Sequence, residues 1–265
     1  MNRIAMKSNS QKGLLHPEYE SSIPENSEAK QVCDYRKEFS DDGMSGAIWT
    51  RNIEYYVNGK LVGKRCYGSD GLLWSESGLN EHGQMHGWHY EFESFDEGHL
   101  QCKEYYDKGL LHGKCKQWSG ERFIGDYTLE YGTGYDLWRH IDEEGNSTLS
   151  EIYQLKDGMP HGYFWRVAND LHEVWSEEHY YEGSLHGIRR QWNFEGRLSR
   201  SFPQYYINNE KVDKRKYLRA SAKDETLPPF REEDQLPQRL FTPFIQKVIL
   251  EDSKRSQDLK SRSHL

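Results

Sequence analysis

The sequence predicts an all-β protein, an extended single-layered antiparallel meander of β-hairpin repeats of about 25 residues with a short C-terminal helix. Three observations lead to this prediction. Glycines recur at a nearly constant interval, a second turn signal lies between them, and the segments between turns are rich in Tyr, Trp, Phe, Ile and Thr. Aromatic and β-branched residues favour strands, and a fixed period of this length is typical of repeat architectures.

The glycine repeat sets the period, with spacings of 24, 26, 21, 28 and 25 residues. The glycines are Gly63, Gly87, Gly113, Gly134, Gly162 and Gly187. All except Gly134 follow another glycine by four positions, and these partners are Gly59, Gly83, Gly109, Gly158 and Gly183. Glu130 holds this place in the fourth repeat, which we therefore expect to be degenerate, and "YYINNEKVDKRKY" (205–217) is expected to be an atypical last unit.

The second turn signal is a shorter Asp/Asn/Glu-Gly type. It ends at Gly71, Gly98, Gly145 and Gly196, with Asn169-Asp170 in the same place of one unit. Glycine, Asn and Asp are suited to turns because they accept positive φ. Two turns and two strands per unit make one hairpin per repeat, and hairpins joined by short loops build an antiparallel meander.

The two ends of the chain differ from the repeats. Residues 1–30 are polar and aperiodic, so we expect a flexible segment before an array that spans 31–217, with clear repeats over 55–217. Residues 218–265 are predicted to form a Pro-containing linker and an amphipathic helix over 243–256. Thr242 would be its N-cap and Pro243 its first residue.

Two roles are open for this helix. We expect it to cap the open end of the sheet, where unpaired strand edges invite aggregation. The alternative is that it docks on a partner or on a membrane surface.

Four segments carry a resemblance to a known family. They are "YYVNGKLVGKRCY" (55–67), "YYDKGLLHGKCKQW" (105–118), "YQLKDGMPHGYFW" (153–165) and "YYEGSLHGIRRQW" (180–192). Their shared pattern resembles the MORN (membrane occupation and recognition nexus) repeat, and most closely the bacterial MORN-variant class of YwqK-type antitoxins. The resemblance covers about 55–217 and implies a sheet of hairpins without catalytic residues that binds another protein, with a membrane link in some members.

A histidine precedes the second glycine in four repeats: His86, His112, His161 and His186. Equivalent positions of successive hairpins are two strands, or ~9.6 Å, apart. Ligands of one zinc ion each lie ~2.0–2.1 Å from the metal. The spacing therefore excludes a shared metal and a proton relay, and each histidine is expected to brace its own turn, with no metal or other cofactor.

Enzymatic chemistry is not indicated. The sequence has no G-x-S-x-G, P-loop or Rossmann glycine motif, and we predict that the protein is not an enzyme. A Ser-Glu dipeptide recurs at Ser75-Glu76, Ser150-Glu151 and Ser176-Glu177. Without a base and an oxyanion site these are expected to be solvated strand positions.

Charge indicates the partner. Residues 55–208 hold 15 Lys+Arg against 24 Asp+Glu, a net charge of −9, whereas residues 209–265 hold 13 against 10, a net charge of +3. An acidic array repels phosphate backbones, so nucleic acid is excluded, membrane contact is expected only through 209–265, and a protein with a basic surface is favoured.

The most concrete function is an antitoxin or immunity protein, monomeric or weakly oligomeric, that blocks a toxin sterically with an acidic, aromatic sheet face. The residues expected on that face are Glu91, Glu93, Asp96, Trp118, Glu177, Glu178 and Trp192. Alternatives are a scaffold that reaches a membrane or an assembly through its basic C-terminal segment, and a structural role through end-to-end sheet pairing. The chain has no apolar run of eighteen residues and its N-terminus lacks the apolar core of a secretory signal, so we expect a cytoplasmic protein.

Overall fold

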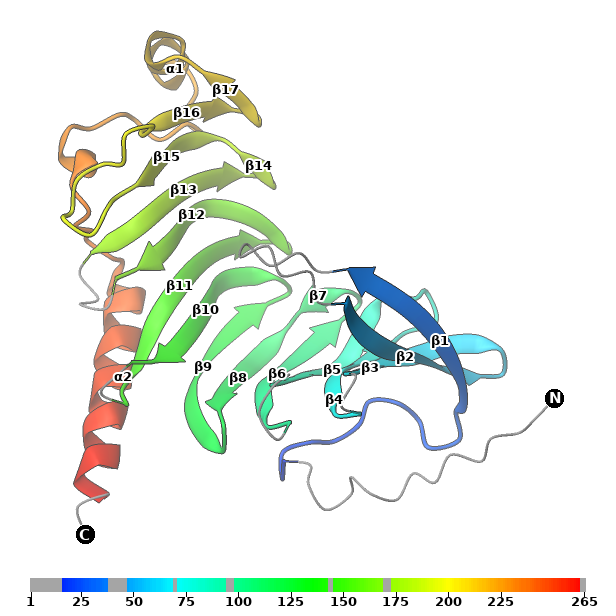
Figure 1. The fold of residues 1–265 in the computed structure, drawn as a ribbon. Helices are drawn as coiled ribbons and strands as arrows, with labels where there is room; N and C mark the ends of the chain where they lie inside the picture. Colours follow the sequence, from blue (N-terminus) through cyan, green and yellow to red (C-terminus); the bar gives the residue numbers. More distant parts are fainter. Residues whose placement is uncertain are drawn as a thin grey trace. The chain divides into compact units, whose positions relative to one another are not determined.

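Over the residues that the structure describes, the strands form one antiparallel sheet of 17 strands, followed by a C-terminal helix (Figure 1), which confirms the predicted meander. The computed structural model describes residues 16–37, 47–68, 71–93, 98–142, 145–168 and 173–262, except for the side chains of 33–37, 47–49 and 256–262. Each strand with a defined register pairs antiparallel with a strand close to it in the sequence. Asn169-Asp170 and Asp96 lie outside the described residues.

The strands, in chain order, are β1 (Glu28–Lys37), β2 (Ala47–Val57), β3 (Lys60–Tyr67), β4 (Leu73–Leu79), β5 (Met85–Phe92), β6 (Leu100–Asp107), β7 (Leu110–Leu111), β8 (Gly113–Ser119), β9 (Arg122–Glu130), β10 (Thr133–Ile141), β11 (Ser147–Lys156), β12 (Met159–Val167), β13 (Val174–Tyr181), β14 (Ser184–Leu185), β15 (Gly187–Gln191), β16 (Gln204–Ile207) and β17 (Glu210–Val212). The helices are α1 (Lys214–Ser221), the 3-10 turn η1 (Glu233–Gln235) and α2 (Pro243–Arg262). The last hairpin, β16–β17, confirms an atypical seventh unit without glycines.

The chain divides into two compact units. Unit 1 consists of Met1–Gly109 and Gln117–Phe123, and unit 2 of Leu110–Lys116 and Ile124–Leu265. Each unit has its own covering segments and is described by itself below.

The first kind of turn is a two-residue loop with both residues in the left-handed region. Asn58 has φ 50° and Gly59 φ 75°, a pair that defines a type I′ turn and fits the right-handed twist of the flanking strands. The same pair of positive φ values occurs at Lys108-Gly109, Tyr131-Gly132, Asp157-Gly158, Glu182-Gly183 and Asn208-Asn209. The turn is therefore what the glycine repeat encodes.

The fourth repeat has a complete hairpin, which corrects the prediction of a degenerate unit. Glu130 is a residue of β9 and pairs with Thr133 of β10, so that Tyr131 and Gly132 form the turn. The turn glycine lies two residues before Gly134 instead of four. The repeat has thus shortened between its two glycines while its turn geometry is conserved.

Unit 1 is covered on one face by residues 16–27, which we call the N-terminal strap. Ile23 is buried, and a Cβ atom on Gly63 would lie 2.5 Å from Cγ1 of Ile23, so glycine is required there for the strap to pass. Ser22 of the strap passes equally close to Gly78 and Gly87, because a Cβ atom on either glycine would lie 2.7 Å from the Ser22 side chain. The sequence analysis, which expected 1–30 to be flexible, missed these contacts.

The core of unit 1 lies between its sheet and this strap. It consists of Leu73, Tyr90, Phe92, Leu100 and Trp118. Tyr19 of the strap packs on this cluster, with its ring 4.9 Å from the ring of Tyr90. The strap therefore supplies part of the second layer that a single sheet lacks.

Unit 2 is covered on one face by its own C-terminal part. Residues 231–241, which we call the C-terminal strap, cross β12–β15, and Phe241 packs on Trp165 with ring centroids 5.5 Å apart. Before this strap, α1 places Tyr217 on Tyr205 of β16 and so adds a second element to the cover. The sequence analysis did not predict α1, whose N-cap is Asp213.

Helix α2 begins at Pro243, as predicted, with the hydroxyl of Thr242 accepting from the N–H of Ile245 at 3.4 Å. It is longer than the predicted 243–256 and lies on the sheet face rather than at the open end. Arg139 of β10 forms a buried ion pair with Asp252 at 2.8 Å, which anchors the helix on that face. The expected role as an end cap is therefore wrong.

Candidate functional site

Three of the four repeated histidines connect their hairpin to the next one, whereas the buried Nδ1 of His161 has no hydrogen-bond partner. Nδ1 of His86 accepts from the N–H of Lys108 at 3.5 Å, and Nδ1 of His112 accepts from Tyr131 at 3.3 Å. Each donor is the first residue of the following type I′ turn. The histidines therefore brace the neighbouring turn, which corrects the expectation that each braces its own.

The same bond recurs in the later repeats of unit 2. Nδ1 of His186 accepts from the N–H of Asn208 at 3.1 Å, and its Nε2 lies 3.1 Å from the hydroxyl of Thr226. In the shortened repeat Thr133 replaces the histidine, and its hydroxyl accepts from the N–H of Asp157 at 3.0 Å. An acceptor at this position is thus retained even where the histidine is not.

At each of these positions, whether histidine or Thr133, a hydrogen bond between two backbone groups also joins the hairpin to the next one. The N–H of the second turn residue donates to the carbonyl of the residue before the histidine, or before Thr133, in the preceding hairpin. These bonds are Gly109 to Met85, Gly132 to Leu111, Gly158 to Gly132, Gly183 to Pro160 and Asn209 to Leu185, at 2.7–3.0 Å. These turns are therefore joined by the backbone bond and, except at His161, by the side-chain bond as well. The described residues contain no group of three or more His, Cys, Asp or Glu arranged to hold a metal ion.

Ser77, His89 and Glu91 form an arrangement that resembles a nucleophile, a base and an acid. The Ser77 hydroxyl lies 2.9 Å from Nδ1 of His89, and Nε2 of His89 lies 3.4 Å from the Glu91 carboxylate. The sequence analysis missed it because strand register, not sequence spacing, makes Ser77 and His89 direct partners. Acyl transfer also needs donors preorganised for an oxyanion, and both strands are paired on both sides within the sheet. The arrangement is explained by cross-strand pairing.

The electrostatics of His89 follow from this pairing. Burial lowers the pKa of His89, but the bond to Glu91 and the negative charges of Glu104 and Glu91 raise it by more, so it lies above its usual value. The imidazolium is thereby favoured on a face that carries several carboxylates.

The glutamates of two Ser-Glu dipeptides are buried, which corrects the expectation of solvated positions. Glu76 is fully buried under the N-terminal strap and accepts from Nε of Arg65 at 2.7 Å, from the Ser21 hydroxyl at 2.7 Å and from the N–H of Ser22 at 3.1 Å. The Tyr19 hydroxyl also donates to it. A buried carboxylate with four donors is a structural anchor for the strap.

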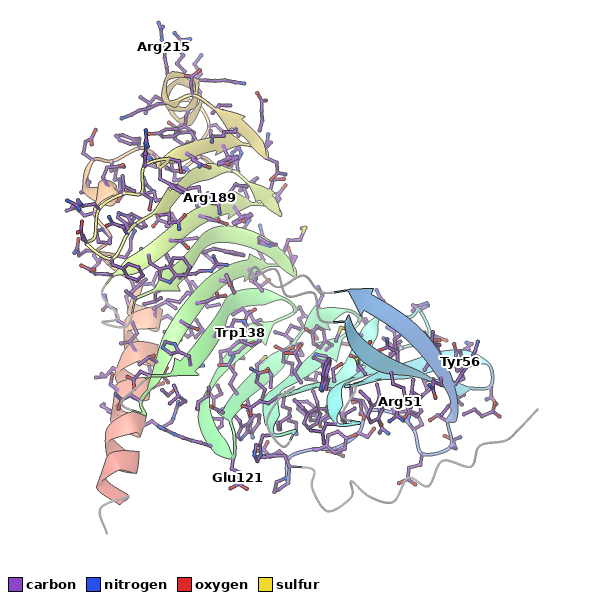
Figure 2. All side chains as sticks on the ribbon, viewed as in Figure 1. Arg51, Tyr56, Glu121, Trp138, Arg189 and Arg215 are labelled. Atoms are coloured by element: carbon purple, nitrogen blue, oxygen red, sulfur yellow. The ribbon has the colours of Figure 1, made fainter. Side chains whose placement is uncertain are left out.

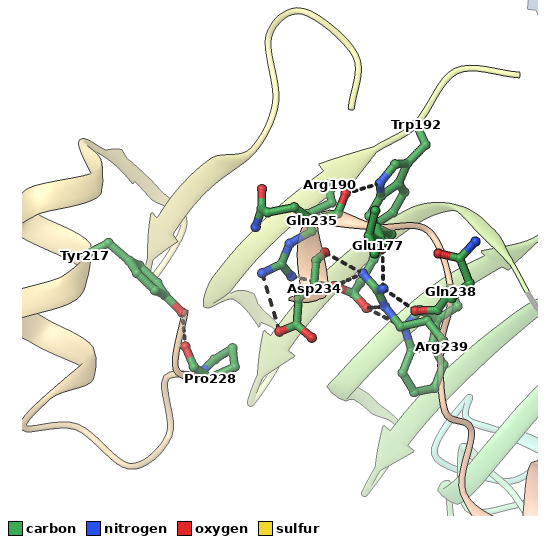
Figure 3. Close-up of polar contacts among 11 residues, drawn as sticks. Glu177, Arg190, Trp192, Tyr217, Pro228, Asp234, Gln235, Gln238 and Arg239 are labelled. Atoms are coloured by element: carbon green, nitrogen blue, oxygen red, sulfur yellow. Dashed lines mark hydrogen bonds and ion pairs between the residues drawn. The ribbon is translucent and has the colours of Figure 1, made fainter. Parts of the chain in front are cut away.

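Glu177 has the equivalent role in unit 2 (Figure 3). It pairs with Arg190 of β15 at 2.6 Å and with Arg239 of the C-terminal strap, and Nε1 of Trp165 donates to it at 2.8 Å. Burial raises the pKa of Glu177, but the bond to Arg239 and the two guanidinium charges lower it by more, so the carboxylate is ionised. Glu151, in the third dipeptide, is only partly buried and pairs with Arg166 at 3.1 Å.

The faces that the straps leave uncovered are the candidate binding surfaces, and we call each the open face of its unit. Because side chains alternate along a strand, Phe164 and Glu178 point away from the strap that covers Trp165 and Glu177. Tyr153, Phe164 and Tyr180 form a row of half-buried rings there, with centroids 4.6 Å apart at each step.

Ion pairs flank this row of rings. Arg189, labelled within the unit 2 sheet in Figure 2, pairs with Glu178 at 2.7 Å. On the other side lies the Glu151–Arg166 pair, and the Arg166 guanidinium lies 5.3 Å from the ring centroid of Trp175, which is 44% exposed. The open face of unit 2 therefore combines accessible rings with charges of both signs.

The residues expected to bind a partner do not share one face. Trp118 and Trp192 are each 4% exposed and Glu177 is 2% exposed, so all three are covered by the protein's own straps and core. Glu178 lies on the open face of unit 2, and Glu91 on the open face of unit 1.

Glu93 and Asp96, the other two residues expected to bind a partner, are not part of the open face of unit 2. Glu93 accepts from the N–H of Gly120 at 3.0 Å, and Asp96 is outside the described residues. An aromatic binding face was predicted, but with Trp118 and Trp192 rather than this row of rings, because the strand register cannot be read from the sequence.

Comparison of the sequence with protein-family models and with curated proteins finds no match. The resemblance to MORN-variant repeats therefore stays a prediction. None of the helices over the described residues combines the length and apolar character needed to span a bilayer.

Proposed function

We propose that this chain is a non-enzymatic protein-binding repeat protein whose open face in unit 2 docks on a basic surface of another protein. An antitoxin or immunity protein that occludes a toxin sterically is the most concrete form of this proposal. One observation carries it: the Tyr153–Phe164–Tyr180 row is accessible on a face that no covering segment of unit 2 protects.

Aromatic side chains bring the largest contact area at low conformational cost and are enriched at protein interfaces. The covered face shows how this sheet treats rings that are structural. Trp165 and Trp192 are buried there under the C-terminal strap, with the Trp192 indole donating to the carbonyl of Gln235 at 2.8 Å. The three open-face rings have no such cover.

The charge of the chain favours a basic partner. The net formal charge is −8, so a positively charged protein approaches faster and a nucleic acid is repelled. This supports protein recognition over binding of phosphate backbones.

A photo-crosslinking experiment tests the proposal. Phe164 and Tyr163 are neighbours on β12 whose side chains point to opposite faces, so a benzophenone amino acid at each position samples the open and the covered face in matched variants. We expect a protein adduct in cells of the native host only from position 164, weakened as salt rises. Equal adducts from both positions, or none from position 164, contradict the proposal.

A second candidate, a scaffold at an anionic membrane, is favoured by α1. Lys214, Arg215, Lys216 and Arg219 are exposed on this helix, where Figure 2 labels Arg215, although Lys216 is paired with Glu210 at 2.9 Å. Polybasic segments are attracted to anionic lipid surfaces.

Flotation with vesicles of phosphatidylcholine and phosphatidylserine distinguishes this candidate. The scaffold function predicts that the full chain floats and that Arg215→Glu with Arg219→Glu abolishes flotation. If the wild-type chain stays in the bottom fraction, this candidate is wrong.

A further inference from the structure

We propose that the open face of β11–β13 holds an anchor site for one arginine side chain of the partner. This proposal rests on the proposed function and specifies the chemistry that the partner must present. It is carried by the shape of the surface, by its rings and carboxylate, and by arginine sites that the chain already contains.

The surface is hollowed at the ring row. An open depression of about 250 Å³ is lined by Tyr153, Phe164, Trp165, Arg166, Ser176, Glu178 and Tyr180. Small-molecule pockets are usually larger than roughly 300 Å³ and enclose most of their ligand. An open depression of this size suits one long side chain that enters from a flat partner surface.

The rings and the carboxylate define the ligand. Phe164 and Tyr180 offer negative ring faces to a cation, an interaction worth more when it is desolvated. Glu178 accepts from the Tyr180 hydroxyl at 2.7 Å and from Nε of Arg189 at 2.7 Å. A carboxylate has about four acceptor positions, so Glu178 retains capacity for a further donor.

The Tyr180 hydroxyl is a permanent donor in this site. Burial, and then the bond to Glu178, raise the pKa of Tyr180 well above its usual range. The hydroxyl keeps its proton at neutral pH and so remains a donor to Glu178.

The chain uses the same combination three times with its own arginines. Arg166 lies over Trp175 and bonds Glu151, Arg239 lies 4.9 Å from the ring centroid of Trp192 and bonds Glu177, and Arg65 lies 5.0 Å from that of Tyr55 and bonds Glu76. Over the described residues, no cation of the chain occupies the ring faces of Phe164 and Tyr180. Glu178 already bonds Arg189, but the guanidinium of Arg189 lies over Phe202, so the rings beside Glu178 have no stacked guanidinium of their own.

Arginine fits this arrangement better than lysine. A guanidinium is planar, stacks on a ring and bonds a carboxylate with its edge at the same time, whereas an ammonium is a compact, strongly hydrated charge. Arg166, the one cation among the lining residues, is already paired with Glu151 and so opposes an incoming charge less.

Unit 1 supplies the matched control. Through the strand registers, Glu54, Lys64 and Ser77 occupy the places that Tyr153, Phe164 and Glu178 hold in unit 2. Lys64, paired with Glu54 at 3.1 Å, stands where Phe164 offers its ring, so an incoming cation meets an ammonium at this place instead of a ring. We expect no arginine site there.

The test is titration of the full chain with hexa-arginine, hexa-lysine and hexa-glutamate peptides, followed by backbone amide NMR shifts. We expect hexa-arginine to shift amides of β11–β13, to bind at least about tenfold more tightly than hexa-lysine, and to lose at least about tenfold in affinity on Phe164→Leu or Glu178→Gln. Lys64→Ala should leave the affinity unchanged.

Two outcomes would overturn the proposal. One is equal affinity of the wild type and Phe164→Leu for hexa-arginine, and the other is equal binding of hexa-arginine and hexa-lysine, which indicates bulk charge only. Circular dichroism of each variant identifies loss of folding, in which case Tyr180→Phe, which keeps the ring and removes the donor to Glu178, is the variant to compare. If the partner crosslinked through position 164 binds Phe164→Leu normally, the arginine anchor fails while the protein-binding function stands.

Discussion

Each unit has one sheet face covered by a strap, and the two straps come from opposite ends of the chain. In unit 1 the N-terminal strap covers one face and is anchored on Glu76, and in unit 2 the C-terminal strap covers one face and is anchored on Glu177. Both glutamates follow a serine at the same place of the repeat. A single sheet buries only what another layer covers, so each unit recruits the segment nearest to it.

The difference between the units lies on the open faces. Unit 1 presents Glu54, Lys64 and Ser77 where unit 2 presents aromatic rings and Glu178. A charged, internally paired surface keeps a sheet soluble, whereas accessible rings cost solubility and are retained where they bind. The two units therefore share one repeat framework and differ in their open faces, and the proposed docking surface lies on unit 2 alone.

Removal of the unit 2 anchor should have the largest effect. Glu177→Ala leaves Arg190 and Arg239 buried without their carboxylate, and breaking a buried pair typically costs about 3–5 kcal/mol of unfolding free energy. Urea denaturation followed by tryptophan fluorescence measures this loss. Glu151→Ala is the control, because its pair with Arg166 is partly exposed and worth about 0–1 kcal/mol. Equal losses would show that Glu177 is not an anchor.

The next largest loss of unfolding free energy is expected where the N-terminal strap passes over Gly63. Gly63→Ala places a Cβ atom 2.5 Å from Cγ1 of Ile23 and should cost about 1–3 kcal/mol through overpacking. In the double variant with Ile23→Ala the clash is relieved, so the two losses should be less than additive by at least about 0.5 kcal/mol. Additive losses in urea denaturation would mean that the strap does not contact Gly63 in solution.

The contacts of the N-terminal strap could not be predicted from the sequence, whereas the hairpins could. The period of the glycines predicted the hairpins, because a type I′ turn requires positive φ and Gly59 supplies it at no steric cost. It did not identify the turn glycine of the fourth repeat, because Gly132 lies two residues before Gly134 instead of four. Thr242 and Pro243 predicted the start of α2 because capping is a local property.

The candidate site was less predictable because it depends on register. A shift of one residue exchanges Phe164 with Trp165, and nothing in the composition of β12 distinguishes the covered from the open face. Burial of Glu177 depends on Arg239, which is 62 residues away in the sequence. Contacts of this range are not contained in a local pattern.

The histidine connection between hairpins should have a smaller effect. His186→Asn removes the bonds to Asn208 and Thr226 while keeping a polar side chain, and a single hydrogen bond is worth about 0.5–1.5 kcal/mol net. We expect a loss of about 1–2 kcal/mol in thermal or urea denaturation. His86→Asn in unit 1 should cost less, because His86 is 44% exposed. The interpretation would be wrong if His186→Asn abolished partner binding without a change in stability.

The smallest expected effect is a pH dependence in unit 1. Because the pKa of folded His89 is raised, its protonation stabilises the fold fully below the unfolded value of roughly 6.5, and this stabilisation is lost as pH rises through the folded value. Besides Glu91 and Glu104, Ser77 and the ring of Tyr106 face His89 across the strands, with the Tyr106 centroid 6.0 Å from that of His89. His89→Gln should therefore flatten the fall in unfolding free energy between pH 6 and pH 8. His89 is not part of the proposed arginine site on β11–β13, so hexa-arginine binding should not follow the same curve, and a shared midpoint would contradict this.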